Sequence, residues 1–200
     1  ARIAGQRALE LSGLAPTALD FVELYSCFPV AVELYAAELG IPADRDWTVT
    51  GGMPFAGGPL NNYVLQATAR MAELLRDKPG SSGLVSSVSG YLTKQGFGVW
   101  SAEPGPRGFV FADVSAEVGA ESPPRVVVPP ADGLARICGY TVMYHNDQRV
   151  CGVALLDLPD GTRTLANTLD QALMDRLESE ECCHREAQLA GGRFSLDREP

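Results

Sequence analysis

The sequence predicts an α/β protein in two parts, with layered helices and strands over residues 1–118 and a small β-rich domain over residues 119–200. Two observations support this fold class. Helical and strand-like patterns alternate along the first part, as in proteins whose helices pack on a sheet. A proline-rich connector, GAESPPRVVVPPADG, then precedes several short strand patterns separated by turns.

The first part begins with a helix over residues 2–12, which has one apolar face and is ended by Gly13. The apolar run DFVELYS, residues 20–26, has the length of a strand. Pro29 then opens a second helix, PVAVELYAAEL, and Gly40 closes it. These signals predict the order helix, strand, helix.

A second strand candidate, TVTGG at residues 48–52, leads through a glycine-rich loop into the longest helix, residues 60–76. We interpret Asn61, Asn62 and Tyr63 at its start as caps or ligand donors, capping being the simpler role. Two strands, SSGLVSSVSGYL and FGVWSAEP, follow, with Lys94 between them. We expect Lys94 to be solvated, the alternative being a contact with a ligand phosphate.

The second part reads as three strands, ARICGYTVMY, RVCGVALLDL and RTLANT, separated by turns at HNDQ and LPDGT. The first turn carries His145, which we expect to be solvated. A helix, LDQALMDRLESEECC, and a last strand in GGRFSLD complete the domain. The pattern predicts a small barrel of the oligonucleotide/oligosaccharide-binding type.

Composition limits the functional classes. The net charge of −9, shared by both parts, argues against a nucleic-acid surface, which needs clustered Lys and Arg. No apolar run reaches the roughly 20 residues of a membrane span, so we expect a cytoplasmic protein without a membrane partner. Cys182, Cys183 and His184 are expected to spread around a helix, so no metal site is predicted. The cysteines show no disulfide or zinc spacing and are expected to be reduced: Cys27, Cys138, Cys151, Cys182 and Cys183.

The glycine-rich loop GGMPFAGGP, residues 51–59, is the strongest local sign of a ligand. Glycines before a helix let a ligand come close to main-chain amides. From the residues alone, the ligand can be a phosphate or an acyl thioester, and the loop can also be only a tight turn.

Three stretches together resemble one family: ALELSGLAPTALDFVELYSCFPVAVELYAAELG, GGMPFAGGPLNNYVLQ and GLVSSVSGYLTKQGFGVWS. In this order, over about residues 1–103, they resemble the C-terminal half of the thiolase superfamily, closest to its sterol-carrier-protein type. Residues 119–200 resemble the extra β domain of some members. The resemblance implies half of a layered α-β-α-β-α fold, and an N-terminal half, carrying the nucleophilic Cys, that lies outside these 200 residues.

The family's Asn-Glu-Ala-Phe motif, His-Asp-Cys-Phe in the sterol-carrier type, aligns with YSCF. Tyr25 then takes the place of the Asn or His, which helps to form an oxyanion hole. A Tyr hydroxyl can donate the same hydrogen bond or act as a proton donor. Each residue has an alternative role. Tyr25 can instead be a strand aromatic that packs on its neighbours. Cys27 can be a nucleophile ahead of a helix or a small buried apolar residue.

The other two motifs lack their reactive side chains. Gly-His-Pro aligns with GGP, which leaves Gly58 in place of the His. Cys-x-Gly aligns with VSG, which leaves Val88 in place of the acid/base Cys, and neither residue can transfer a proton. The resemblance therefore implies catalytic roles for Tyr25 and Cys27 and substrate contacts from Phe28, Gly57, Gly58, Pro59, Ser89 and Gly90.

The resemblance predicts the C-terminal part of an acetyl-CoA acetyltransferase-like enzyme that acts on lipid or sterol acyl-CoA thioesters. Coenzyme A enters as part of the substrate, and no bound cofactor is expected. The alternative is a non-catalytic module that binds acyl-CoA or a partner protein. An exposed apolar face left by the absent half also predicts homo-oligomers.

Overall fold

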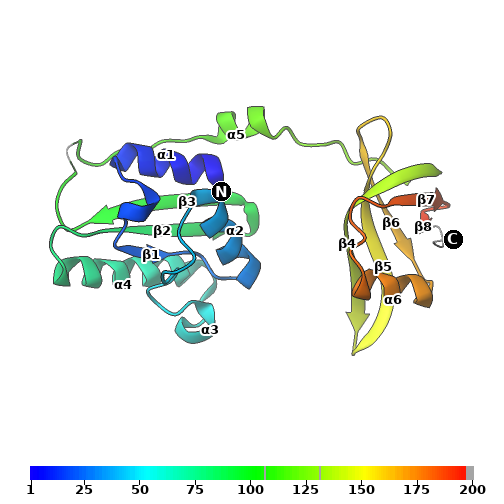
Figure 1. Ribbon diagram of the computed structural model, residues 1–200, viewed down its shortest axis with the longest axis horizontal. Coiled ribbons are helices and arrows are strands. Elements are labelled where there is room, and N and C mark those ends of the chain that lie inside the picture. The colour runs from blue at the N-terminus through cyan, green and yellow to red at the C-terminus, as the bar shows by residue number, and fades with distance from the viewer. Residues whose placement is uncertain (106, 131, 197–200) are drawn as a thin grey trace. The chain divides into compact units, whose positions relative to one another are not determined.

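The computed structural model describes residues 1–105, 107–130 and 132–196, and the chain divides into two compact units, Ala1–Ser122 and Pro123–Pro200 (Figure 1). The division falls after Ser122 instead of after Val118. The reason is the short helix α5 (Ser115–Glu121), which belongs to the first unit. Its Glu117 and Glu121 pair with Arg7 and Arg2 of the first helix.

The first unit is a three-stranded sheet with helices on both faces (Figure 1). Strand β1 is parallel to β2, and β2 is antiparallel to β3. The strands are β1 (Phe21–Glu23), β2 (Ser82–Ser89) and β3 (Tyr91–Ser101), and the main helices are α1 (Arg2–Ser12), α2 (Pro29–Leu39) and α4 (Tyr63–Asp77).

Alternation of side chains along the strands gives the sheet two apolar faces. One face, with Val22 of β1 and Leu24 directly after that strand, packs against α1 and α2. The opposite face, with Val85 of β2, packs against Tyr63 and Met71 of α4. This arrangement of helices on both faces of a sheet follows the predicted α/β class.

The predicted ends of the first two helices are confirmed. Gly13 and Gly40 both adopt left-handed backbone conformations directly after α1 and α2. Their amides bond back to the last carbonyls of the helices, which is the usual glycine termination. Pro29 occupies the first turn of α2, where its missing N–H is not needed.

The strand predicted at residues 48–52 is wrong. The backbone amides of Val49 and Thr50 donate to the carboxylate of Glu23, at 2.7 and 3.0 Å, instead of joining a strand ladder. The chain then forms the short helix α3 (Met53–Ala56) and a 3₁₀ turn, Leu60–Asn62, before α4. The capping role of Asn62 is also wrong, because its side chain makes no cap hydrogen bond.

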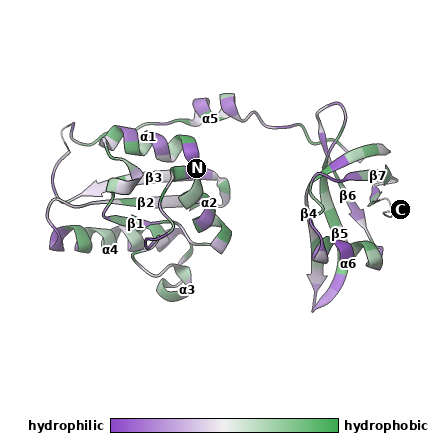
Figure 2. Cartoon of the chain, viewed as in Figure 1, coloured by the Kyte–Doolittle hydropathy of each residue, from purple (hydrophilic) through white to green (hydrophobic). Residues whose placement is uncertain are grey.

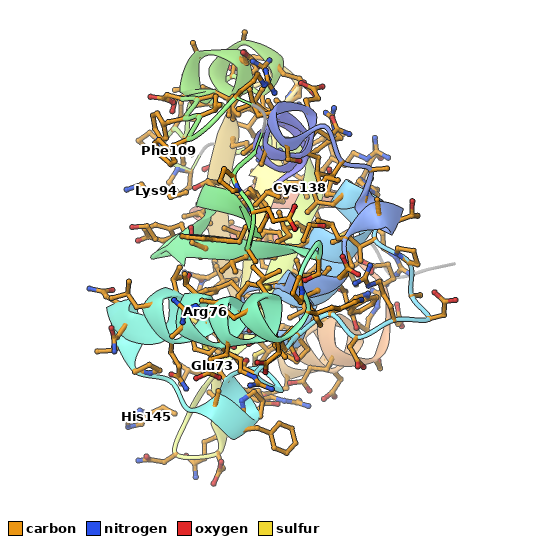
Figure 3. The ribbon with its side chains drawn as sticks, turned by 90° about the vertical axis from the view of Figure 1, so that its left-hand side faces the viewer. Glu73, Arg76, Lys94, Phe109, Cys138 and His145 are labelled. Carbon is orange, nitrogen blue, oxygen red and sulfur yellow. The ribbon has the colours of Figure 1, made fainter. Side chains whose placement is uncertain are left out.

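The two strands predicted after α4 form one hairpin, with Gly90 at its turn. Strand β3 already begins at Tyr91, so Lys94 lies within it and not between two strands. Its side chain is exposed, and Figure 3 shows it at the margin of the unit.

The second unit is a closed five-stranded barrel with neighbour order β4-β5-β6-β8-β7, which confirms the predicted barrel. The buried residues Ile137, Leu156 and Leu189 fill its core, together with Leu173 and Leu177 of a helix at its end. The elements are β4 (Gly133–His145), β5 (Gln148–Asp157), β6 (Arg163–Thr168), α6 (Gln171–Ser179), β7 (Glu186–Ala190) and β8 (Arg193–Ser195).

The first barrel turn follows the sequence closely. Asn146 and Asp147 both have positive φ, as a two-residue hairpin loop requires, and His145 beside them is exposed as expected.

The last helix is shorter than predicted. It ends at Ser179, so Cys182 and Cys183 lie in a connection and not around a helix. The amide of His184 donates to the carbonyl of Ile137 at 2.7 Å, which starts the pairing of the chain with β4 and leads into β7. The sequence did not predict β7, because this strand pairs with a strand some 50 residues earlier.

Candidate functional site

The three sequence motifs lie toward one edge of the first sheet. Because β1 and β2 are parallel, their carboxyl ends lie at the same edge, with Tyr25 two residues after the end of β1 and Ser89 as the last residue of β2. Helix α4 runs back toward the start of β2, so the loop before α4 returns to that edge as well. The carboxyl edge of parallel strands is where ligands bind in α/β sheets.

Tyr25 is the best candidate for a hydrogen-bond donor at this edge. The Oγ of Ser86 accepts from its backbone amide at 2.8 Å, and its ring packs edge-on against Tyr63, with centroids 5.5 Å apart. Its hydroxyl has no hydrogen-bond partner among the described residues. Burial, more than the nearby Cys27 thiol, raises the pKa of Tyr25, so the phenol stays protonated and can donate near neutral pH.

Cys27 and Phe28 differ in their surroundings. Cys27 is half-buried and packs against the core cluster shared with α2, which fits its interpretation as a small apolar residue. Phe28, directly before α2, has 67% of its surface exposed. It is therefore available to a ligand or to another polypeptide.

The glycines of the loop have different reasons to be glycine. Gly52 has φ 76°, and an added Cβ would come within 3.1 Å of the Ser26 Oγ. Gly57 has φ 85° and ψ 162°, a backbone conformation that only glycine adopts readily. Gly58 has neither constraint, because its φ is ordinary and the space around it is open. Gly57, Gly58 and Pro59 are all exposed.

The third motif forms the β2–β3 turn. Val88 is half-buried against the same core cluster as Cys27, while Ser89 and Gly90 are exposed. Gly90 has φ 77°, and an added Cβ would have no neighbour within 4 Å. Ser89 and the backbone of this turn therefore face open space.

A buried carboxylate, Glu23, is the main feature that the sequence analysis missed. It is fully buried and accepts four hydrogen bonds: two from the amides of Val49 and Thr50, and two from the hydroxyls of Thr50 (2.9 Å) and Tyr63 (2.6 Å). Within the described part of the chain, none of these partners is a cation. The signal in the sequence was an acidic residue in the middle of an apolar strand.

The network continues to the loop after β1. The Tyr63 proton goes to Glu23, so Ser26, whose Oγ lies 3.3 Å from the Tyr63 oxygen, is the donor of that pair. Ser26 Oγ also accepts from the amide of Met53 at 2.9 Å. One connected set of hydrogen bonds thus joins the YSCF loop, the start of the glycine loop and helix α4.

Tyr35 of α2 lies close to the same edge. Its ring contacts Phe97 edge-on, and its hydroxyl is buried without a hydrogen-bond partner among the described residues. Burial, followed by the Cys27 and Tyr25 groups nearby, raises its pKa to about 12. Tyr35 therefore remains neutral and serves as packing.

The arrangement offers the Tyr25 hydroxyl as a hydrogen-bond donor, but it holds no proton-transfer group at the positions of Gly58 and Val88. In the ranges that the structure describes, no three His, Cys, Asp or Glu side chains are grouped so that they could hold a metal ion. None of the described helices is long and apolar enough to span a membrane.

A scan against protein-family models finds no match, and neither does a search of curated protein sequences. Among solved structures, the chain is similar to a monomeric SCP2-thiolase-like protein type 1 from Mycobacterium smegmatis. The two share 32% sequence identity, and the TM-score is 0.80. The alignment covers 96% of this chain and 44% of the other, so this chain spans less than half the length of that protein.

Proposed function

From the thiolase-like α/β fold of this chain, we propose that it binds acyl-coenzyme A thioesters as one part of a thiolase-like acyltransferase. The substrate class is a lipid- or sterol-derived acyl-CoA. The observation that carries the proposal is that the Tyr25 hydroxyl has no hydrogen-bond partner among the described residues, while Tyr25 lies at the same sheet edge as the glycine loop and the Ser89–Gly90 turn.

In this proposal, the thioester carbonyl accepts a hydrogen bond from the Tyr25 hydroxyl. The negative charge that develops on that oxygen during acyl transfer is thereby stabilised. Gly57 and Gly58 leave room for the coenzyme A arm near main-chain amides. We place the attacking sulfur on polypeptide outside these 200 residues, since Cys27 is half-buried against the core cluster shared with α2.

The apolar site rim, which we define as Phe28, Phe55, Leu60 and Leu65, supports the need for further polypeptide. These side chains are between 67% and 86% exposed. Helix α3, which carries Phe55, is coloured hydrophobic in Figure 2 although it lies on the surface of its unit. We propose that this rim receives the remaining part of a thiolase-like unit.

Calorimetry on the 200-residue chain tests the proposal. Acetyl-CoA and decanoyl-CoA are each titrated into the wild-type chain and into Tyr25→Phe. Free coenzyme A is the reference ligand. Loss of one hydrogen bond of about 0.5–1.5 kcal/mol should weaken thioester binding by roughly 2- to 10-fold. Tyr144→Phe, in the barrel, is the control and should bind as the wild type does.

Absence of binding to either thioester contradicts the proposal, and equal binding by Tyr25→Phe removes Tyr25 from it. A second candidate, a non-catalytic acyl-CoA carrier, is favoured by the missing acid/base side chains at Gly58 and Val88. An assay for release of the coenzyme A thiol separates the acyltransferase from the carrier. If acyl-CoA binds but coenzyme A is not released, even when the remaining part of a thiolase-like unit is added, the result favours the carrier.

A further inference from the structure

Packing of the sheet alone does not require a carboxylate at the position of Glu23. A fully buried carboxylate costs much solvation free energy unless donors surround it. Here four donors offset that cost, and they come from two separate segments, residues 49–50 and Tyr63. The group therefore acts as a junction between segments that are distant in sequence.

Tyr63 connects this junction to the site. Its hydroxyl is fixed by Glu23, and the side chain is 1% exposed, so the ring has no freedom to turn away. The ring meets that of Tyr25 at an interplanar angle of 84°. Because the Tyr25 amide is bonded to Ser86, only the side-chain torsions of Tyr25 remain free, and the Tyr63 ring restricts them.

The same junction also fixes the glycine loop. Ser26 donates to Tyr63 and accepts from Met53, while the Thr50 hydroxyl accepts from the amide of Gly52 at 3.2 Å. These hydrogen bonds thus fix the loop that carries Tyr25 relative to the start of the loop that carries Gly57.

We propose that Glu23 and Tyr63 are positioning residues of the site: Glu23 fixes Tyr63, and the ring of Tyr63 directs the Tyr25 hydroxyl toward the space beside the glycine loop. The proposal rests on the thioester-binding function put forward above. It assigns neither residue a contact with the substrate.

The test compares Tyr63→Leu, which removes the ring, with Tyr63→Phe, which keeps the ring and its volume but loses the bond to Glu23. Tyr35→Phe is the matched control, because it removes a buried hydroxyl that has no hydrogen-bond partner in residues 1–105, 107–130 and 132–196. Two quantities are measured on the 200-residue chain: the affinity for acetyl-CoA, and the pKa of Tyr25 by NMR of chain labelled with ¹³C at the Tyr ring carbon that bears oxygen.

With Tyr63→Leu, we expect acetyl-CoA affinity to fall by about tenfold and the Tyr25 pKa to fall toward its ordinary value of about 10, because the released phenol becomes hydrated. With Tyr63→Phe, the Tyr25 pKa should stay raised and the affinity should fall by only about threefold. Tyr35→Phe should leave both quantities unchanged.

An unchanged Tyr25 pKa in Tyr63→Leu overturns the positioning role, even if the variant is less stable. If Tyr63→Leu does not fold, Tyr63→Phe decides. A Tyr25 pKa that falls to its ordinary value in Tyr63→Phe, which keeps the ring, overturns the proposal that the ring positions Tyr25. If the wild type does not bind acetyl-CoA, the proposed function fails, while the Tyr25 titration still decides the positioning role.

Discussion

At the scale of single residues, the backbone separates two neighbouring glycines that look equivalent in the sequence. Gly57 has φ 85° and ψ 162°, whereas Gly58 has an ordinary φ and open space where a Cβ would go. Only the first position therefore requires glycine for backbone reasons.

Gly57→Ala should lower the free energy of unfolding of the first unit by about 1–3 kcal/mol, the usual cost of a non-glycine residue in such a conformation. Gly58→Ala should change it by less than about 0.5 kcal/mol. Urea unfolding followed by Trp47 and Trp100 fluorescence, both in the first unit, measures the difference. Equal destabilisation by both substitutions would contradict a special backbone requirement for glycine at residue 57.

Residue-level chemistry was only partly visible in the sequence. Tyr25 was singled out because of the motif, and its hydroxyl, which has no hydrogen-bond partner in the described part of the chain, is consistent with that hypothesis. Glu23 was not singled out, and Tyr63 was interpreted only as a cap or a ligand donor, because an acidic residue in a strand and a Tyr at a helix start each have many structural roles. Their meaning comes from the 2.6 Å bond between them, across 40 residues of chain.

At the scale of elements, local signals fixed helices and turns better than strands. Gly13, Gly40 and the Asn146–Asp147 turn act through their own backbone conformations, so their effects were predictable. The segment at residues 48–52 has strand-like composition, but the Glu23 carboxylate takes the amides that a neighbouring strand would have used.

The β5–β6 hairpin gives a pH-dependent prediction. Asp157 pairs with Arg163 across the hairpin, with Nε–Oδ1 at 2.7 Å, and also with Arg125 at 3.3 Å. The Arg163 hydrogen bond is the main reason that the pKa of Asp157 lies below its usual range. A lowered pKa in the folded state means that the pair stabilises the barrel above the unfolded-state pKa of about 3.9, and that this contribution is lost as pH falls below it.

Asp157→Asn should therefore reduce the difference between the free energies of unfolding of the barrel at pH 6 and at pH 3. The measurement is urea unfolding followed by NMR peak intensities of barrel amides at both pH values. Asp147→Asn, at an exposed residue of the β4–β5 turn, is the control. If Asp157→Asn and the control show the same pH dependence, the hairpin pair does not contribute.

At the scale of the whole molecule, the two units have separate cores, and the apolar site rim of the first unit is uncovered. Phe55 and Leu60 of this rim are 86% and 84% exposed. Large exposed apolar side chains that lie close together usually mark an interaction surface. In the absence of further polypeptide, the same surface is available to a second copy of the chain.

We therefore expect the 200-residue chain to self-associate, with a weight-average mass in sedimentation equilibrium that rises with concentration. The double variant Phe55→Ser, Leu60→Ser should shift it toward the monomer, whereas Val126→Ser, an exposed apolar residue outside the rim, should not. A wild-type chain that stays monomeric at high micromolar concentration would contradict this expectation.

The sequence by itself determined the α/β class, the ends of the first two helices, the first barrel turn and the barrel, because each follows from the periodicity of apolar residues or from a local backbone preference. Only the tertiary structure decided that Glu23 captures residues 49–50, that the three motifs share one sheet edge, and that residues 186–190 pair with β4. Those features depend on contacts between segments tens of residues apart, and no local pattern specifies which partner a buried carboxylate or an unpaired strand will meet.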